Sequence, residues 1–454
     1  MERGNPTERG NSINSCRMAG ITAVIQAGGL GSRMRELTQD AIPKPMLVMN
    51  GKPMLLWQIE KLAEYGIHDF VIVIGHLGGK VREYFGDGRY FGVNIDYIEE
   101  KEPLGSAGAL YYLRKFPAER YLLIYGDVMF DMDVRRLLDF HLEKKALITL
   151  ICHPNGHPQD SDLLEADSQQ RVTKFLWKKE KRTGWFTNLV NAGLFVFEQE
   201  VLNYIPKPVK TDWEREIVGS LLSTGRVFGY RTSEYIKDAG TPDRFRKVAA
   251  EQQSGTWEIK NLSRKQRCVF LDRDGTVNRY AGLVSHPQQL ELYEGVAEAI
   301  RLLNESGYLA VIVTNQPVVA RGLCSEEDVR EIHRKLETLL GEDGVYLDGI
   351  VFCPHHPDKG YPEENPAYKI ECGCRKPKTG MIEAMADRYN IDLSESYMIG
   401  DTTIDIQTGA NAGLHTVLVH TGEGGEDGKY SAVPEMEAED LLTAVRKILS
   451  TELY

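Results

Sequence analysis

Short apolar runs alternate with longer helical patterns along most of the chain. The first half begins with an apolar run over 21–27, a glycine-rich turn, a helical pattern over 54–65 and an apolar run over 70–74. Apolar runs of about four to eight residues between turn residues are typical of buried strands, while apolar residues three and four apart are typical of helices. Further strands of this half are predicted at 93–98, 121–125, 147–151, 194–197 and 227–230.

A second series of the same kind follows the polar stretch 251–266. Its strands are predicted from Val269 onward and then at 309–313, 349–352, 397–399 and 416–419. Strands that alternate with helices predict an α/β fold, here with two domains that each hold a mostly parallel sheet flanked by helices. We expect a flexible extension over 1–19, a first domain over 20–250, a linker over 251–266 and a second domain over 267–454.

Composition agrees with two soluble domains. A chain of 454 residues, 42% hydrophobic and 26% charged, can form two full cores. We expect no membrane partner and a cytoplasmic location, because no apolar run approaches the roughly 20 residues of a membrane span and the first residues lack a signal-peptide core, with Met18 as an alternative start. The net charge of −12 argues against nonspecific nucleic-acid binding but allows phosphorylated substrates held by local cations and Mg²⁺.

Two carboxylates stand at the end of the strand that opens the second series. Asp272 and Asp274 point to the same side of an extended chain, and Gly275 lets the chain turn sharply away. Carboxylates held this close repel each other unless a cation lies between them. Alone, the pattern is equally typical of a solvated Asp-Gly turn.

Later strands supply the remaining groups of a phosphoryl-transfer site. One apolar strand ends at Thr314 and Asn315, another ends at Asp401, and Lys376 lies between them in the sequence. With this order of carboxylates, hydroxyl and cation, the second half resembles the phosphatases of the haloacid dehalogenase (HAD) superfamily. The resemblance implies a Rossmann-like domain that hydrolyses phosphate monoesters.

The resemblance also implies a role for each residue. Asp272 would attack the phosphorus, and Asp274 would protonate the leaving oxygen and then activate water. Mg²⁺ would be held by Asp272, the backbone carbonyl of Asp274 and Asp401. Asp405 has either an orienting or capping role or is only solvated at the surface. The residues expected to hold the phosphate are Thr314, Asn315 and Lys376.

A cysteine-rich segment precedes Lys376. The candidate metal ligands are Cys353, His355, Cys372 and Cys374. A Cys-x-His and a Cys-x-Cys pair fit a closed tetrahedral Zn²⁺ site, whereas a dithiol switch would leave His355 unexplained. His356 is the alternative ligand, although the resemblance favours His355.

The four ligands narrow the resemblance to phosphatases for D-glycero-D-manno-heptose 1,7-bisphosphate and for histidinol phosphate. Arg375, expected to contact the substrate, and Lys376 directly follow Cys374, so zinc would fix the catalytic lysine. The segment 317–319 reads Pro-Val-Val where many relatives have Ser-Gly-Ile, which leaves the contacts of Gln316 and Arg321 open.

A glycine-rich loop over 26–34 follows the first strand of the chain. Its glycines, among them Gly28 and Gly29, can bring backbone N–H groups close to a phosphate. The loop lacks the third glycine of the dinucleotide fingerprint and the Gly-Lys-Ser/Thr of the ATPase loop. Arg33 and Lys44 are instead cations suited to a triphosphate.

Six short motifs occur in the order found in sugar-1-phosphate nucleotidylyltransferases, at 27–33, 43–45, 104–108, 126–127, 191–193 and 238–242. Residues 20–250 therefore resemble that family. The resemblance implies that Arg33 steadies the β- and γ-phosphates, that Lys44 lies near the phosphates, and that Asp127 and Asp238 hold Mg²⁺. The residues expected to face the base and the sugar are Gln26, Gly105, Gly108 and Asn191.

One motif departs from this family. Its usual Glu-Lys-Pro reads Glu-Lys-Arg at 180–182, so Lys181 is the expected ligand of the sugar phosphate, with Lys178 and Lys179 as alternatives. Taken singly, Asn191 could be only a strand entry and Asp238 only a turn residue. Their occurrence in the family's order favours the functional interpretation.

Together the two resemblances predict consecutive reactions. A phosphatase would remove the C7 phosphate of D-glycero-D-manno-heptose 1,7-bisphosphate, and a nucleotidyltransferase would join the remaining 1-phosphate to a nucleotide, with GTP and the α anomer preferred. One alternative is a mannose-1-phosphate guanylyltransferase fused to another sugar-phosphate phosphatase. Another is a histidinol-phosphate phosphatase whose first half senses nucleotide sugars, although the presence of Arg33, Asp127 and Asp238 argues against a sensor. The sequence predicts no oligomeric state.

Overall fold

The computed structural model describes residues 20–29, 31–360 and 363–451. The expected flexible extension over 1–19, including Met18, lies outside these residues. The chain divides into two compact units built from discontinuous segments. The first unit comprises Met1–Cys152, Leu164–Phe175 and Asn191–Asn261, and the second comprises His153–Leu163, Leu176–Val190 and Leu262–Tyr454.

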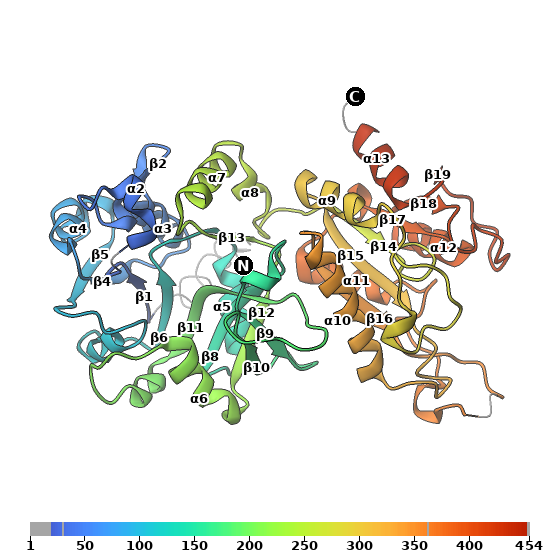
Figure 1. The fold of residues 1–454 in the computed structure, drawn as a ribbon, viewed down its shortest axis with the longest axis horizontal. Coiled ribbons are helices and arrows are strands. Elements are labelled where there is room, and N and C mark those ends of the chain that lie inside the picture. Colours follow the sequence, from blue (N-terminus) through green and yellow to red (C-terminus); the bar gives the residue numbers. More distant parts are fainter. Residues whose placement is uncertain (1–19, 30, 361–362, 452–454) are drawn as a thin grey trace, which may run out of the picture. The chain divides into compact units, whose positions relative to one another are not determined.

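A mixed sheet of nine strands forms the centre of the first half of the chain (Figure 1). Its main order is β10-β9-β11-β6-β1-β4-β5, and β8 pairs with β11 and β12. β1 pairs in parallel with both β4 and β6, whereas β11 runs antiparallel to β6. The strands are β1 (Ile21–Gln26), β4 (Asp69–Ile74), β5 (Asn94–Glu99), β6 (Arg120–Tyr125), β8 (Ile148–His153), β9 (Leu163–Ala166), β10 (Val172–Leu176), β11 (Val190–Glu198) and β12 (Val227–Arg231).

Alternate residues of β1 point to opposite faces of this sheet. Ile21, Ala23 and Ile25 join one core cluster, together with buried residues of three helices. Those helices are α3 (Met54–Glu64), α4 (Gly78–Phe85) and α5 (Val134–Glu143). Shorter elements of this half are β2 (Val48–Met49), β3 (Lys52–Pro53), α2 (Arg35–Thr38) and α6 (Gly219–Leu221).

A two-stranded antiparallel ribbon that the apolar pattern did not predict joins distant parts of the first unit. It pairs β7 (Val128–Asp131) with β13 (Tyr235–Asp238). Helices α7 (Pro242–Gln253) and α8 (Thr256–Ile259) follow, so helical residues occupy part of the stretch expected to be a linker. Trp257 of α8 is fully buried and stacks on Tyr235 with ring centroids 5.0 Å apart. Trp257 therefore packs this part of the chain into a core cluster of the first unit.

The second unit holds a six-stranded sheet in which all pairs are parallel. The order is β16-β15-β14-β17-β18-β19, which places the first strand of the series near the middle. The strands are β14 (Cys268–Leu271), β15 (Leu309–Asn315), β16 (Gly349–Cys353), β17 (Tyr397–Gly400), β18 (His415–Val419) and β19 (Met436–Ala438). The predicted α/β class with mostly parallel sheets is thus confirmed.

Helices cover both faces of this second sheet. Val269 and Leu271 face a core cluster shared with α9 (Val296–Ser306), α10 (Glu326–Glu342) and α13 (Leu441–Thr451). Cys268 and Phe270 face the opposite cluster, which includes α11 (Gly380–Tyr389), and α12 (Thr403–Ala412) contacts β17 and β18. In the part of the chain that the structure describes, no helix combines the length and apolar character needed to cross a bilayer.

Candidate active sites

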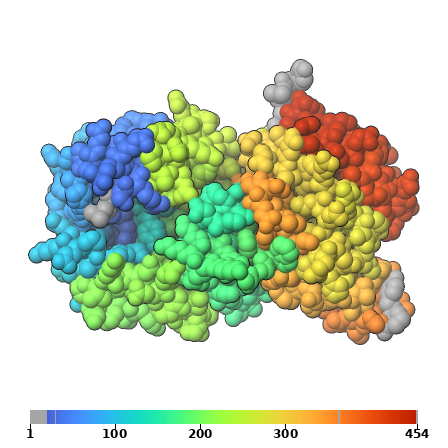
Figure 2. Space-filling view, in the orientation of Figure 1, coloured from blue at the N-terminus to red at the C-terminus, as the bar shows by residue number. Residues whose placement is uncertain are grey.

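The carboxyl end of β1 is the switch point of the first sheet. Neighbours β4 and β6 lie on opposite sides of β1, and such a point in an α/β sheet opens a crevice that commonly takes a ligand. Gln26, the last residue of β1, donates from Nε2 to the Ser106 carbonyl oxygen at 2.6 Å. The space-filling view shows the first unit hollowed beside the blue segment that carries the following loop (Figure 2).

The glycines of this loop have different environments. Gly31 has φ 61° and precedes a 3-10 turn over Ser32–Met34, in which Arg33 is exposed. A methyl group on Gly28 would lie 2.5 Å from the Glu100 carboxylate, whereas one on Gly29 would meet nothing within 4 Å. The backbone at Gly29 is therefore open to a ligand, whereas Gly28 lies against the Glu100 side chain.

Lys44, Asp127 and Asp238 converge on one point. Lys44 Nζ forms an ion pair with Asp127. A methyl group on Gly240 would lie 2.5 Å from Asp238 Oδ1, 3.0 Å from Lys44 Nζ and 3.1 Å from Asp127 Oδ2. Arg244 Nη1 contacts the other Asp238 oxygen at 2.5 Å. Two carboxylates and a lysine around a position without a side chain fit Mg²⁺ and a phosphate, because Mg²⁺ prefers oxygen ligands and substrate phosphates.

The segment 104–108 packs tightly on another loop of the first unit. Gly105 has φ 74°, and a methyl group there would lie 2.4 Å from the Thr211 carbonyl oxygen. One on Gly108 would lie 2.1 Å from the Val209 carbonyl oxygen. The two glycines, expected near the base, therefore have a packing role in the close approach of these backbones.

Asn191 lies beside a buried acid that the motifs did not identify. Its Nδ2 donates to Glu214 Oε1 at 3.3 Å, and the Tyr125 hydroxyl donates to the same oxygen at 2.7 Å. Burial raises the pKa of Glu214 to about 7, and nearby Asp212 adds to the effect, while the Tyr125 and Asn191 hydrogen bonds oppose it. Glu214 lies on a π-helical segment, Trp213–Val218, where no short sequence pattern reveals its partners.

The three lysines proposed for the sugar phosphate are all exposed. Lys178 Nζ lies 3.6 Å from Asp160 Oδ1. Binding of the sugar phosphate by Lys179 or Lys181 stays a prediction. Arg182, which replaces the family's proline, donates to the carbonyl oxygens of Pro158 and Leu176, each at 2.8 Å. The arginine that replaces the family's proline thus anchors the loop in which it lies.

Asp272 occupies the switch point of the second sheet. It follows β14, which lies between β15 and β17, and its backbone N–H donates to the Ile399 carbonyl oxygen at 2.9 Å. Lys376 Nζ lies 2.8 Å from Asp272 Oδ1 and 2.5 Å from Asp405 Oδ1. Burial opposes the charged form of Lys376, but the two carboxylates outweigh it and raise its pKa. Asp405 is fully buried, and it also caps α12 through Thr402.

The carboxylates of Asp272, Asp401 and Asp405 offer oxygens within 4.8 Å of one another. Burial, opposed by Lys376, raises the pKa of Asp272 to about 6, and burial followed by repulsion from Asp272 and Asp405 raises that of Asp401 to about 8. Three buried carboxylates against one lysine leave negative charge that a divalent cation would neutralise. This donor set fits Mg²⁺. A methyl group on Gly275 (φ 89°) would lie 2.2 Å from Asp401 Oδ2, so glycine is required there.

Thr314 and Asn315 lie at the end of β15. The Gln316 side-chain amide donates to Thr314 Oγ1 at 2.9 Å and to Asp274 Oδ2 at 2.8 Å. Asn315 is paired with the main chain of Lys376: the Lys376 N–H donates to Asn315 Oδ1 at 3.0 Å, and Asn315 Nδ2 donates to the Lys376 carbonyl oxygen at 3.2 Å. The amide side chain therefore fixes the backbone of the lysine.

The four candidate zinc ligands come together. The Sγ atoms of Cys353, Cys372 and Cys374 lie 3.2–3.5 Å apart, and His355 Nδ1 lies 3.7 Å from Cys353 Sγ and 3.5 Å from Cys374 Sγ. Tetrahedral Zn²⁺ with bonds of about 2.0–2.3 Å requires ligand separations of roughly 3.5–3.8 Å. The separations from His355 Nδ1 lie in this range, and the sulfur atoms would hold the ion after moving apart by a few tenths of an ångström. Nδ1 of the alternative ligand His356 instead accepts the Asp358 N–H at 3.2 Å.

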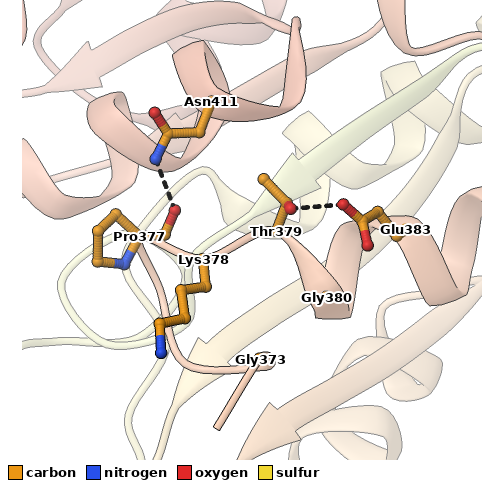
Figure 3. Close-up of a pocket in the computed structure, with 7 residues that line it drawn as sticks. All are labelled: Gly373, Pro377, Lys378, Thr379, Gly380, Glu383 and Asn411. Carbon is orange, nitrogen blue, oxygen red and sulfur yellow. Dashed lines mark hydrogen bonds between the residues drawn. The ribbon is translucent and has the colours of Figure 1, made fainter. Parts of the chain in front are cut away.

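A cavity of about 450 Å³ lies on the segment that follows Lys376 (Figure 3). Asn411 donates to the Pro377 carbonyl oxygen at 2.9 Å on one side, and the Thr379 hydroxyl donates to Glu383 at 2.6 Å on the other. Its lining contains none of the aspartates described above. The carboxylates at the switch point of the second sheet therefore do not line this cavity. Arg375, also expected to touch substrate, donates to the His355 carbonyl oxygen at 3.1 Å.

Two family models match the chain. A nucleotidyl transferase model matches residues 22–255, and a HAD-hydrolase-like model matches residues 373–444. Mannose-1-phosphate guanylyltransferase of Mycobacterium tuberculosis is 34% identical over 238 residues, which are 52% of this chain and 65% of the relative, so the chain spans slightly less than two thirds of that protein's length.

The second half matches a different group of curated proteins. D-glycero-β-D-manno-heptose-1,7-bisphosphate 7-phosphatase of Haemophilus ducreyi is 44% identical over 160 residues, covering 35% of this chain and 85% of the relative. A solved D,D-heptose 1,7-bisphosphate phosphatase from B. bronchiseptica, complexed with magnesium and phosphate, is 33% identical over 41% of this chain and 99% of its own, with a TM-score of 0.36. HddC from Yersinia pseudotuberculosis, complexed with GMP-PN, is 24% identical over 51% of this chain and 99% of its own, with a TM-score of 0.44.

Proposed function

We propose that this bifunctional enzyme makes a nucleotide-activated heptose. The proposal follows from the families of its two halves: the chain belongs to the nucleotidyl transferase family through its first half, and to the heptose-1,7-bisphosphate 7-phosphatase family of HAD enzymes through its second. It removes the C7 phosphate of D-glycero-D-manno-heptose 1,7-bisphosphate and transfers a nucleotidyl group to the heptose 1-phosphate. The observation that carries the proposal is that one chain holds a carboxylate–lysine cluster at each of two sheet switch points. The proposed boundaries are a transferase domain over 20–250 and a phosphatase domain over 267–454.

In the phosphatase step, an Asp272 oxygen forms a bond to phosphorus while the bond from phosphorus to the sugar oxygen breaks. Asp274 gives its proton to that oxygen. It then takes a proton from the water that cleaves the aspartyl phosphate and releases inorganic phosphate. Lys376 and Thr314 hold the phosphoryl oxygens. Mg²⁺ held by Asp272, Asp401 and the Asp274 carbonyl would supply charge neutralisation.

In the transfer step, an oxygen of the sugar 1-phosphate attacks the α-phosphorus of the nucleotide and pyrophosphate leaves. Arg33 and Lys44 hold the departing phosphates, and Asn191 faces the sugar. Such in-line transfer depends mainly on positioning and charge neutralisation. Mg²⁺ held by Asp127 and Asp238 would supply the charge neutralisation. The convergence of these two aspartates around Gly240 supports this assignment.

Zn²⁺ held by the Cys353–Cys374 cluster is proposed as a structural ion. A closed set of four ligands leaves no open position for substrate, so the ion would stabilise the loop that carries Arg375 and Lys376. The sulfur and nitrogen separations described above support this role.

The test is to incubate the pure protein with each anomer of heptose 1,7-bisphosphate, Mg²⁺ and one nucleoside triphosphate at a time. We expect inorganic phosphate, pyrophosphate and an NDP-heptose, with GTP the fastest nucleotide. We propose the α anomer as substrate, whereas the phosphatase relatives are named for the β anomer, so the rates for the two anomers decide the point. Phosphate release without pyrophosphate from any nucleotide would overturn the transferase assignment.

A further inference from the structure

Arg273 lies in the sequence between Asp272 and Asp274 of the proposed phosphatase site, and its side chain is completely buried. Its guanidinium forms a fork with the neighbouring carboxylate of Asp274. Nη2 donates to Oδ1 at 2.9 Å and to Oδ2 at 2.8 Å, and Nε lies 3.2 Å from Oδ1. Fork contacts between arginine and a carboxylate fix direction as well as charge, because the guanidinium is planar and rigid.

The guanidinium is itself held from α10 and from the end of β15. Its Nη1 lies 3.1 Å from His333 Nε2, and its Nη2 donates to Gln316 Oε1 at 3.0 Å. Burial, followed by the nearby charges of Arg273 and Arg330, keeps the pKa of His333 well below its ordinary value. A neutral imidazole can accept a hydrogen bond on Nε2, so His333 serves as an acceptor for Arg273.

Two further donors complete the surroundings of Asp274. Gln316 Nε2 donates to Oδ2 at 2.8 Å, and Asn278 Nδ2 donates to Oδ1 at 3.0 Å. Both carboxylate oxygens are therefore fixed by three side chains, two from the turn that follows β14 and one from the end of β15. A carboxylate held at both oxygens has one orientation. Proton transfer to the leaving oxygen then requires that one of the two amide donors, Asn278 or Gln316, gives up its contact while the arginine fork keeps the direction.

We propose that Arg273 is a positioning residue for the phosphatase, and that His333 holds its guanidinium so that the fork aims the carboxylate of Asp274 at the leaving oxygen. This inference rests on the proposed phosphatase function, in which Asp274 transfers the proton. The hydrogen-bond partners of the Arg273 guanidinium are Asp274, Gln316 and His333, and none of these side chains is assigned to the phosphate. Its loss should therefore slow turnover and leave substrate binding unchanged.

The experiment compares kcat and KM for phosphate release in Arg273→Ala, Arg273→Lys and Arg301→Ala. A misplacement of about 1 Å costs on the order of a hundredfold in rate, so kcat should fall by that order in Arg273→Ala with KM little changed. Added guanidinium should restore part of the rate. Arg273→Lys should remain slow, because it keeps the charge and loses the fork. Arg301 of α9 is exposed and donates to the Asp343 carbonyl oxygen, so Arg301→Ala is the matched control.

A second arm leaves Arg273 in place. His333→Gln keeps an acceptor for Nη1 and should stay near the wild-type rate, whereas His333→Leu removes it and should lower kcat. Unchanged kcat in folded Arg273→Ala and in His333→Leu would overturn the inference, and so would a raised KM with unchanged kcat. Absence of phosphate release by the wild-type protein would instead overturn the proposed function, and the inference with it.

Discussion

Replacing Cys374 by serine should remove bound zinc and cripple the phosphatase without affecting nucleotidyl transfer. Cys374 lies two residues before Lys376, and its Sγ lies 3.2–3.5 Å from Cys353 Sγ, Cys372 Sγ and His355 Nδ1. Zinc bound there would tie the segment that leads directly to Lys376 to the segment that carries Cys353 and His355. Without the ion, the three sulfur atoms and the imidazole have no common partner, and the loop should loosen first.

The expected size of the effect follows from the position of Lys376. Its Nζ lies 2.8 Å from Asp272 Oδ1, so a displacement of about 1 Å would take the pair to about 3.8 Å, beyond hydrogen-bond distance. A displacement of that size costs on the order of a hundredfold in rate. Asn315 holds the Lys376 backbone through two hydrogen bonds, which should limit the movement and leave measurable residual turnover.

The assay measures zinc by atomic emission, phosphate release and pyrophosphate release on one preparation. Cys372→Ser should behave like Cys374→Ser, because both remove one of the four ligands. Cys324→Ser is the matched control, since Cys324 is a free cysteine of the same unit outside the cluster. A variant that loses its zinc and keeps the full phosphatase rate would refute the argument that the ion positions Lys376.

Three other substitutions test the separate sites. Asp272→Asn should abolish phosphate release and leave transfer to a supplied sugar 1-phosphate intact; loss of both activities in a folded protein would contradict this. Asp127→Asn should stop pyrophosphate release while the bisphosphate is still cleaved, and persistent transfer would place the metal elsewhere. Burial raises the pKa of Glu214 from 4.5 to about 7, so its stabilising contribution, present in full below pH 4.5, should be lost as pH rises to about 7, by about 3 kcal/mol. Melting temperatures at several pH values should therefore show a steeper decline for the wild type than for Glu214→Gln, and parallel curves would refute the assignment.

The apolar pattern alone located the strands that carry the chemistry. The predicted run over 21–27 is β1, and the runs from Val269 and over 309–313 are β14 and β15. This worked because strands buried on both faces are continuous apolar runs, and because ligand-binding side chains follow directly where such strands end. The ribbon of β7 and β13 was missed, since its two short strands are far apart in the sequence and pair only after the chain has folded.

The sequence by itself determined the fold class, the two family resemblances and the types of residue available at each strand end. Only the tertiary structure decided which of them meet. Asp127 and Asp238 come together because the ribbon pairs their neighbourhoods. The structure also places His355 beside the three cysteines, while His356 Nδ1 accepts the Asp358 N–H. Arg273 had no motif of its own. Its fork, and the His333 that holds it, depend on packing between β14 and α10, which local sequence patterns do not encode.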